Sequence, residues 1–238
     1  MAASTVKALF FDTFGTVVDW RSTVIREGEA LGARKKWNID WTAFADEWRF
    51  DGYKAGYAKV SKGELPWMTV DALHRMQLDR MLESRGLASA LSEEEKDSFN
   101  KVWHRLLPWA DSIPGLLRLR RKYIIAPFSN GNVALLTNMA KHVGLPWDCI
   151  LSTELTRIYK PDSRTYRMAV ELLGLPPEQV MMVAAHIFDL RGAQAAGLRT
   201  AFVSRPAEFG GGREADKDTG LGFDLSVRDF MELADTMG

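Results

Sequence analysis

Polar residues that could carry chemistry follow four separate apolar runs of this sequence. They are Asp12, Ser129-Asn130, Lys160 and the pair His186 and Asp189. A buried carboxylate such as Asp12 can act as a nucleophile, and a nearby lysine charge would keep it ionised. A histidine, whose ordinary pKa is about 6.5, can donate a hydrogen bond or serve as a base. If one fold brings these side chains together, the sequence predicts nucleophilic catalysis by Asp12.

The elements that must position these residues are short apolar runs that alternate with helical patterns. Runs at residues 8–11, 123–127, 180–185 and 200–203 predict buried strands of a parallel sheet. Helical spacing occurs at 133–142, 163–173 and 190–196, where Gly197 is a C-cap and Asp189 is expected at the end of the preceding strand. This alternation predicts a doubly wound α/β layer whose ligands bind at the carboxyl ends of the strands.

A long segment between the first strand and the rest of the sheet has a different pattern. Residues 19–102 show helical periodicity, many tryptophans and no convincing strand. We interpret them as an inserted helical subdomain, with residues 1–18 and 103–238 forming the α/β core. Most aromatic residues of the insert are expected to pack its interior. Residues 204–222, which include three consecutive glycines, are interpreted as a surface loop without chemistry.

The composition limits the classes of function. The 238 residues are 46% hydrophobic and 26% charged, with 31 basic and 31 acidic side chains, so no net field attracts nucleic acid or an anionic membrane. No segment approaches the roughly 20 apolar residues of a membrane span, and the first apolar run reaches Asp12 too early for a signal peptide. The single cysteine, Cys149, excludes an internal disulfide, and we interpret it as a packing residue. We therefore expect a cytoplasmic protein with no nucleic-acid and no membrane partner.

Four segments resemble the four motifs of the haloacid dehalogenase superfamily. They are FDTFGT, SNG, KPD and AAHIFDLRGAQAAGL, and the resemblance spans residues 6–14 and 113–203. Within the superfamily the chain is similar to the L-2-haloacid dehalogenase (type II) family. The Ala-Ala-His version of the fourth motif resembles a subgroup in which some members also release fluoride from fluoroacetate. The resemblance implies a Rossmann-like core with residues 19–102 as its helical cap, a haloacid substrate, no cofactor and a tendency to form homodimers.

Two positions distinguish a dehalogenase from the more common phosphatases of this superfamily. Most members are magnesium-dependent phosphatases with a second aspartate two residues after the nucleophile, where this chain has Phe14. Their fourth motif usually has two acidic residues four apart, where this chain has Ala185 and Asp189. Losing a carboxylate weakens a magnesium site, and a halide leaving group needs no proton from a general acid. We therefore expect no bound metal.

The resemblance implies roles for the residues near the predicted crevice. Asp12 would attack the halogen-bearing carbon, and Lys160 would pair with Asp12. Asp189 would position or deprotonate the water that hydrolyses the resulting ester. His186, where better-known members have asparagine, would donate a hydrogen bond to the leaving halide, which suits fluoride, or would act as the base. A structural role, such as capping the turn after a strand, is the alternative for each residue.

The resemblance also implies a set of substrate-binding and halide-binding residues. Ser129 would hold the substrate carboxylate and Asn130 the halide, while Arg49 would bind either anion. Phe14 and Phe188 would pack around the carbon and the halogen. The rest of this set is Thr16, in the turn after Asp12, and Tyr166, six residues after Lys160. Turn chemistry, a solvated charge and core packing are the alternative interpretations.

These interpretations together predict one reaction and leave two alternatives. We expect hydrolytic dehalogenation of short 2-haloalkanoic acids to 2-hydroxy acids, with inversion, through an ester of Asp12. Fluoroacetate is included as a candidate substrate. The alternatives are a magnesium-dependent phosphatase and a non-catalytic member that binds a small anion.

Overall fold

A six-stranded parallel sheet forms the centre of the computed structural model, which describes residues 5–238. Its order is β5 (Leu151–Ser152), β4 (Ile124–Ser129), β1 (Ala8–Phe11), β6 (Val180–Ala184), β7 (Arg199–Val203) and β8 (Leu225–Val227). β1 lies in the middle because it pairs with both β4 and β6. Its four residues are all buried, which explains why they form a continuous apolar run instead of an alternating one.

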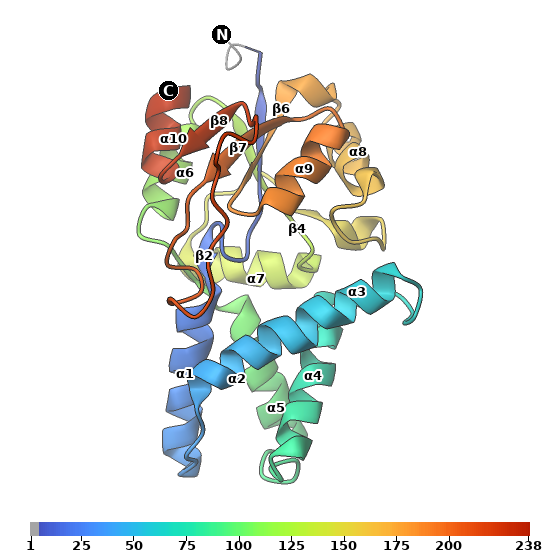
Figure 1. The fold of residues 1–238 in the computed structure, drawn as a ribbon, viewed down its shortest axis with the longest axis vertical. Helices are drawn as coiled ribbons and strands as arrows, with labels where there is room; N and C mark the ends of the chain where they lie inside the picture. Colours follow the sequence, from blue (N-terminus) through green and yellow to red (C-terminus); the bar gives the residue numbers. More distant parts are fainter. Residues whose placement is uncertain (1–4) are drawn as a thin grey trace.

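Helices cover both faces of this sheet (Figure 1). α6 (Ser112–Leu119), α7 (Val133–Val143) and α10 (Phe230–Met237) bury their apolar residues with Leu9 and Phe11 of β1. α8 (Ser163–Leu172) and α9 (Ile187–Ala195) pack with Ala8 and Phe10, which point to the opposite face. The expected doubly wound α/β architecture is therefore confirmed.

A second group of helices lies together beyond one edge of the sheet layer (Figure 1). The group consists of α1 (Trp20–Lys35), α2 (Trp41–Glu47), the π-helical segment η2 (Trp48–Lys54), α3 (Ala55–Ser61), α4 (Val70–Ser84) and α5 (Glu93–Asn100). Its interior is aromatic, with Trp41, Phe44 and Trp48 buried against Phe99. We propose that residues 19–102 are the cap; of the predicted core segment 1–18, the first four residues lie outside the described residues.

Short connections join the two groups of elements. β2 (Val18–Asp19) pairs antiparallel with β3 (Leu107–Pro108), so the chain enters and leaves the helical group at neighbouring points. The 3₁₀ segments are η3 (Lys101–His104), η4 (Thr153–Leu155) and η5 (Pro177–Gln179). The sequence analysis missed β2, β3, β5 and β8, because two or three residues are too few to show a pattern.

Of two predicted element boundaries near the reacting groups, one is confirmed and one is wrong. The strand at 180–185 is confirmed, since β6 ends at Ala184. The expected helix at 190–196 was placed too late, because α9 begins at Ile187. Asp189 therefore lies in the first turn of a helix and not at the end of a strand.

Candidate active site

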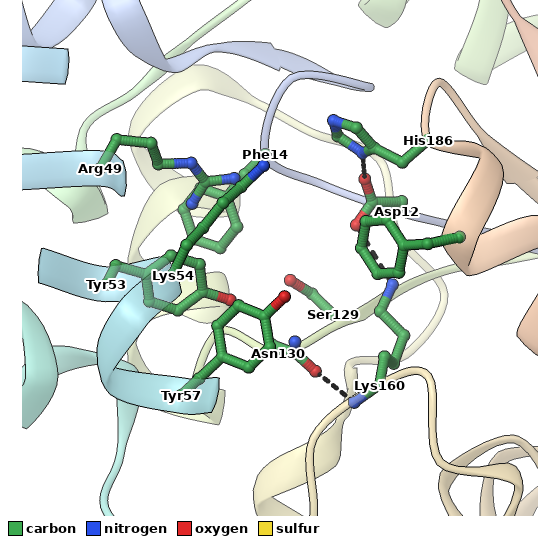
Figure 2. Close-up of a pocket in the computed structure, with 11 residues that line it drawn as sticks. Asp12, Phe14, Arg49, Tyr53, Lys54, Tyr57, Ser129, Asn130, Lys160 and His186 are labelled. Atoms are coloured by element: carbon green, nitrogen blue, oxygen red, sulfur yellow. Dashed lines mark hydrogen bonds and ion pairs between the residues drawn. The ribbon is translucent and has the colours of Figure 1, made fainter. Parts of the chain in front are cut away.

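A small cavity lies where β1, β4 and β6 end, between the sheet and η2. Its volume is about 30 Å³. The residues that line it are Asp12, Phe14, Arg49, Tyr53, Lys54, Tyr57, Ser129, Asn130, Lys160, His186 and Phe188. Figure 2 shows Arg49, Tyr53 and Tyr57 projecting from the helical side toward Asp12, Lys160 and His186. Eight of the predicted site residues thus meet in one place.

Both carboxylate oxygens of Asp12 have hydrogen-bond partners in this cavity. Its Oδ1 accepts from Lys160 Nζ at 3.1 Å, and its Oδ2 accepts from Thr16 Oγ1 at 2.9 Å and pairs with His186 Nδ1 at 2.8 Å. Thr16 Oγ1 also accepts from the backbone N–H of Ala185. Burial alone would raise the pKa of Asp12, but the Lys160 charge and the hydrogen bonds from His186 and Thr16 hold it well below its usual range. Asp12 is therefore an ionised carboxylate at neutral pH.

Lys160 is held in place by three acceptors. Besides Asp12, its Nζ donates to the carbonyl oxygen of Phe128 at 2.8 Å and to Asp189 Oδ2 at 2.5 Å. Burial opposes the charge, but the two carboxylates raise the pKa of Lys160 above its ordinary value. The ammonium group is only 2% exposed and has all three donors engaged.

Asp189 lies behind Lys160 and does not line the cavity. Its Oδ1 accepts from Tyr166 Oη at 2.5 Å, so each carboxylate oxygen already has a donor. Both Asp189 and Tyr166 are completely buried. Burial raises the pKa of Asp189, in spite of the Lys160 charge. Asp189 and Tyr166 thus form a buried hydrogen-bonded pair behind Lys160, outside the lining of the cavity.

Ser129 and Asn130 form the floor of the cavity at the end of β4. Asn130 Oδ1 accepts from the backbone N–H of Lys160 at 2.8 Å and from Thr153 Oγ1 at 3.2 Å. Ser129 Oγ accepts from the N–H of Gly131 at 3.1 Å. Because these contacts use the amide oxygen of Asn130, its NH₂ group is left as the donor toward other partners.

Arg49 brings a buried positive charge to the cavity, and no carboxylate of residues 5–238 is hydrogen-bonded to its Nε or Nη1. Its guanidinium carbon lies 4.8 Å from the ring centre of Tyr53, 5.2 Å from Phe14 and 5.4 Å from Trp20. Arg49 is 4% exposed, and its Nε and Nη1 have no hydrogen-bond partner within residues 5–238. Buried charges are normally paired, so this one marks a place for an anionic ligand.

Lys54 is a second cation on the same wall, and the sequence analysis did not identify it. It comes from η2, as Arg49 does, and it lines the cavity. Burial and the nearby Arg49 charge lower the pKa of Lys54 to about 8. Tyr53 and Tyr57 line the cavity as well, so they belong to the minority of the insert's aromatic residues that do not only pack its interior.

His186 lies between two carboxylates. Opposite Asp12, its Nε2 is 3.1 Å from Oε2 and 3.2 Å from Oε1 of Glu208. Burial opposes protonation, but Glu208 and Asp12 raise the pKa of His186 to about 10. His186 is thus an imidazolium at neutral pH. Both N–H groups already have acceptors, so no third one is available to a halide.

Glu208 contradicts our interpretation of residues 204–222 as a loop without chemistry. The segment contains no helix or strand, but Glu208 is 2% exposed and also accepts from Trp20 Nε1 at 3.2 Å. Gly15 provides the space: a Cβ atom there would lie 2.2 Å from Glu208 Oε1, and its φ of +87° favours glycine. No local sequence signal reveals Glu208, since its partner is 22 residues away.

A magnesium ion does not fit these residues. Both oxygens of Asp12 accept from protein donors, and the ammonium of Lys160 occupies the space between Asp12 and Asp189. The position that would supply a further carboxylate is Ala185. Within the described part of the chain, no group of three or more His, Cys, Asp or Glu side chains could hold a metal ion.

Comparison with known proteins identifies the family. A model of the family described as haloacid dehalogenase-like hydrolase matches residues 6–197. The chain belongs to the haloacid dehalogenase-like hydrolases. The matched segment of this hydrolase, residues 6–197, includes every predicted site residue but ends before Glu208.

Relatives with known structures or names show which haloacid dehalogenase-like hydrolases this chain is similar to. A defluorinating L-2-haloacid dehalogenase of known structure is 42% identical, with a TM-score of 0.94 over 98% of this chain and 95% of that one. A second L-2-haloacid dehalogenase is 40% identical, with a TM-score of 0.89 over 98% and 100%. The (S)-2-haloacid dehalogenase 4A of Burkholderia cepacia is 29% identical over 86% of this chain and 87% of its own. The expected family and fold are confirmed. No helix of residues 5–238 is long and apolar enough to cross a membrane.

Proposed function

We propose that this hydrolase removes halogen from short 2-haloalkanoic acids and forms 2-hydroxy acids with inverted configuration. The observation that carries the proposal is an ionised Asp12 that faces a small cavity containing the unpaired Arg49. The likeness to L-2-haloacid dehalogenases supports the same reaction. Fluoroacetate is included because one of these relatives is named as defluorinating. A cytoplasmic location and a homodimer stay predictions.

The first step is a displacement at carbon. An oxygen of Asp12 attacks the halogen-bearing carbon from the side opposite the halogen, and the C–X bond breaks as the new C–O bond forms. Arg49, whose Nε and Nη1 have no partner within residues 5–238, receives either the substrate carboxylate or the departing halide, and Asn130 with Ser129 receives the other. Phe14 and Phe188 line the space for the carbon and halogen.

The second step hydrolyses the ester of Asp12 at its acyl carbon and restores the carboxylate. Lys160 stays beside the reacting group throughout, because Asp189 and Phe128 hold its other two N–H groups. We propose that Asp189 and Tyr166 position Lys160, and that Thr16 donates to the Asp12 oxygen during both steps. These roles replace the direct action on water that the sequence suggested for Asp189.

Halide release from a set of small acids tests this function. We expect release from chloroacetate, fluoroacetate and the (S) enantiomer of 2-chloropropionate, all of which carry the carboxylate and the adjacent halogen-bearing carbon that the proposed reaction needs. A chelator should leave the rates unchanged. Hydrolysis of a phosphate ester that magnesium restores, with no halide release, would support the phosphatase alternative instead.

Replacement of Arg49 by methionine should separate activity from stability. We expect kcat/KM for chloroacetate to fall about 10- to 100-fold, which corresponds to the loss of one charged hydrogen bond to the substrate. The free energy of unfolding should stay equal or rise, since the unpaired buried charge of Arg49 is removed. Urea titration and steady-state kinetics measure the two effects. A large loss of stability would show that Arg49 is a structural residue.

A further inference from the structure

A chain of three side chains runs from the reacting carboxylate into the protein. Asp12 Oδ2 contacts His186 Nδ1 at 2.8 Å, and His186 Nε2 contacts both oxygens of Glu208 at 3.1 and 3.2 Å. Trp20 Nε1 fixes Glu208 from the other side at 3.2 Å. All three acidic and basic groups are at least nine-tenths buried. The imidazole therefore has one defined orientation, with one nitrogen toward Asp12 and the other toward Glu208.

We propose that Glu208 is a positioning residue that holds His186 as the base for hydrolysis of the Asp12 ester. This inference rests on the proposed function and assigns the second step of that reaction. A base must lie near both the attacking water and the acyl carbon. His186 meets this requirement because it lines the cavity and contacts the carboxyl group that is attacked. Asp189 does not, because Lys160 and Tyr166 enclose it.

The two steps give His186 two different states. While Asp12 is a carboxylate, the imidazole is held between two negative charges and is protonated. Alkylation converts Asp12 into a neutral ester, so one of these charges disappears and His186 releases its proton more easily. Overall, hydrolysis of a carbon–halogen bond yields one proton with the halide, and His186 supplies that proton to solvent.

Proton transfer in the second step then balances. Neutral His186 takes a proton from water while the water oxygen bonds to the acyl carbon of Asp12. The ester C–O bond breaks, and the departing alkoxide of the product takes the proton from His186. The Asp12 carboxyl group returns its own proton to His186, which restores the initial ion pair. Glu208 keeps its charge and its hydrogen bond to Nε2 through all of these events.

Charged groups from several neighbouring elements surround His186 and influence its pKa. Direct contacts come from Asp12 and Glu208. Lys160 contacts the other oxygen of Asp12. Arg49 and Lys54, both in η2, line the same cavity. The others are Arg213, Glu214 and Asp216, which line the outer hollow beside His186. Within residues 5–238 only Glu208 contacts Nε2, so its replacement changes the orientation of the ring as well as its charge environment.

Glu208→Gln tests the proposal with chloroacetate. A rapid-quench experiment measures chloride release in the first turnover, and steady-state kinetics measure complete turnover. We expect first-turnover release to persist within a few-fold, steady-state turnover to fall about 10- to 100-fold, and the esterified protein to accumulate in mass spectra. The exposed Glu178→Gln is the matched control and should behave as wild type.

The pH profile separates positioning from a structural role. Hydrolysis needs neutral His186, so its rate falls on the acidic side of the histidine pKa in the alkylated enzyme. Removing the Glu208 charge lowers that pKa, which should move this acidic limb to lower pH while the plateau also falls. Unchanged turnover, or equal loss of first-turnover release and steady-state turnover with no movement of the limb, would overturn the role of Glu208. If wild-type protein releases no chloride at all, the proposed function fails instead.

Discussion

We expect replacement of Asp12 by asparagine to lower halide release by at least about 10⁴-fold, because a neutral amide is a very poor nucleophile. The fold should persist. Lys160 retains Asp189 as its counter-charge, and His186 retains Glu208. Halide electrodes or ion chromatography measure the rate, and circular dichroism verifies the fold. Substantial remaining release by a folded variant would contradict the assignment of Asp12.

A labelling experiment on the wild-type protein checks the same nucleophile. A single turnover in isotopic water should place the solvent oxygen in Asp12 first, and only later turnovers should place it in the product. Asp235→Asn, on the exposed end of α10, is the matched control for the variant and should retain full activity. Label that reaches the product in the first turnover would indicate direct attack by water.

Replacement of Lys160 by methionine should affect activity nearly as strongly. Loss of the lysine charge would raise the pKa of Asp12, because burial would then be opposed only by His186 and Thr16, so less of the carboxyl group would be ionised. We expect halide release to fall at least about 100-fold, with partial recovery as the pH is raised. Lys62→Met, an exposed lysine of the insert, is the control. Near-normal release by Lys160→Met would disprove its role.

The same substitution should also destabilise the protein in a pH-dependent way. Removing Lys160 leaves Asp12 and Asp189 buried without their shared cation, which should lower the free energy of unfolding by about 3–5 kcal/mol. Folded-state pKa values of both carboxyls would be raised, so stability is retained at low pH and lost as the pH rises through them. Urea titrations at acidic and neutral pH should therefore show the larger loss at neutral pH. A loss that is greater at acidic pH would contradict this explanation.

The central part of the fold could be predicted because burial on both faces leaves a visible pattern. β1 and β6 are continuous apolar runs and β4 is apolar up to Phe128, and Asp12 and Ser129 follow these runs at the carboxyl ends of the strands. Strands such as β5 (Leu151–Ser152) contain a single apolar residue and carry no such pattern. Asp189 was misplaced for a related reason, since the residues before Leu190 resemble the end of a strand as much as the start of a helix.

The candidate site was predictable where its residues belong to motifs and unpredictable where they do not. Arg49 and Asn130 lie in recognisable segments, and both line the cavity. Lys54 and Glu208 have no local signal, because their roles depend on contacts with distant residues. Glu208 in particular lies among glycine and charged residues, a composition that is typical of a solvent-exposed loop. Its contact with His186 depends on the three-dimensional path of that loop.

Gly15 and Glu208 constrain each other within the pocket. A Cβ atom at position 15 would lie 2.2 Å from Glu208 Oε1 and 2.4 Å from its Cδ, so any side chain there must displace the carboxylate. The φ of +87° at Gly15 adds backbone strain to every such substitution. The identity of residue 15 therefore controls whether an acid 193 residues away in the sequence can reach His186.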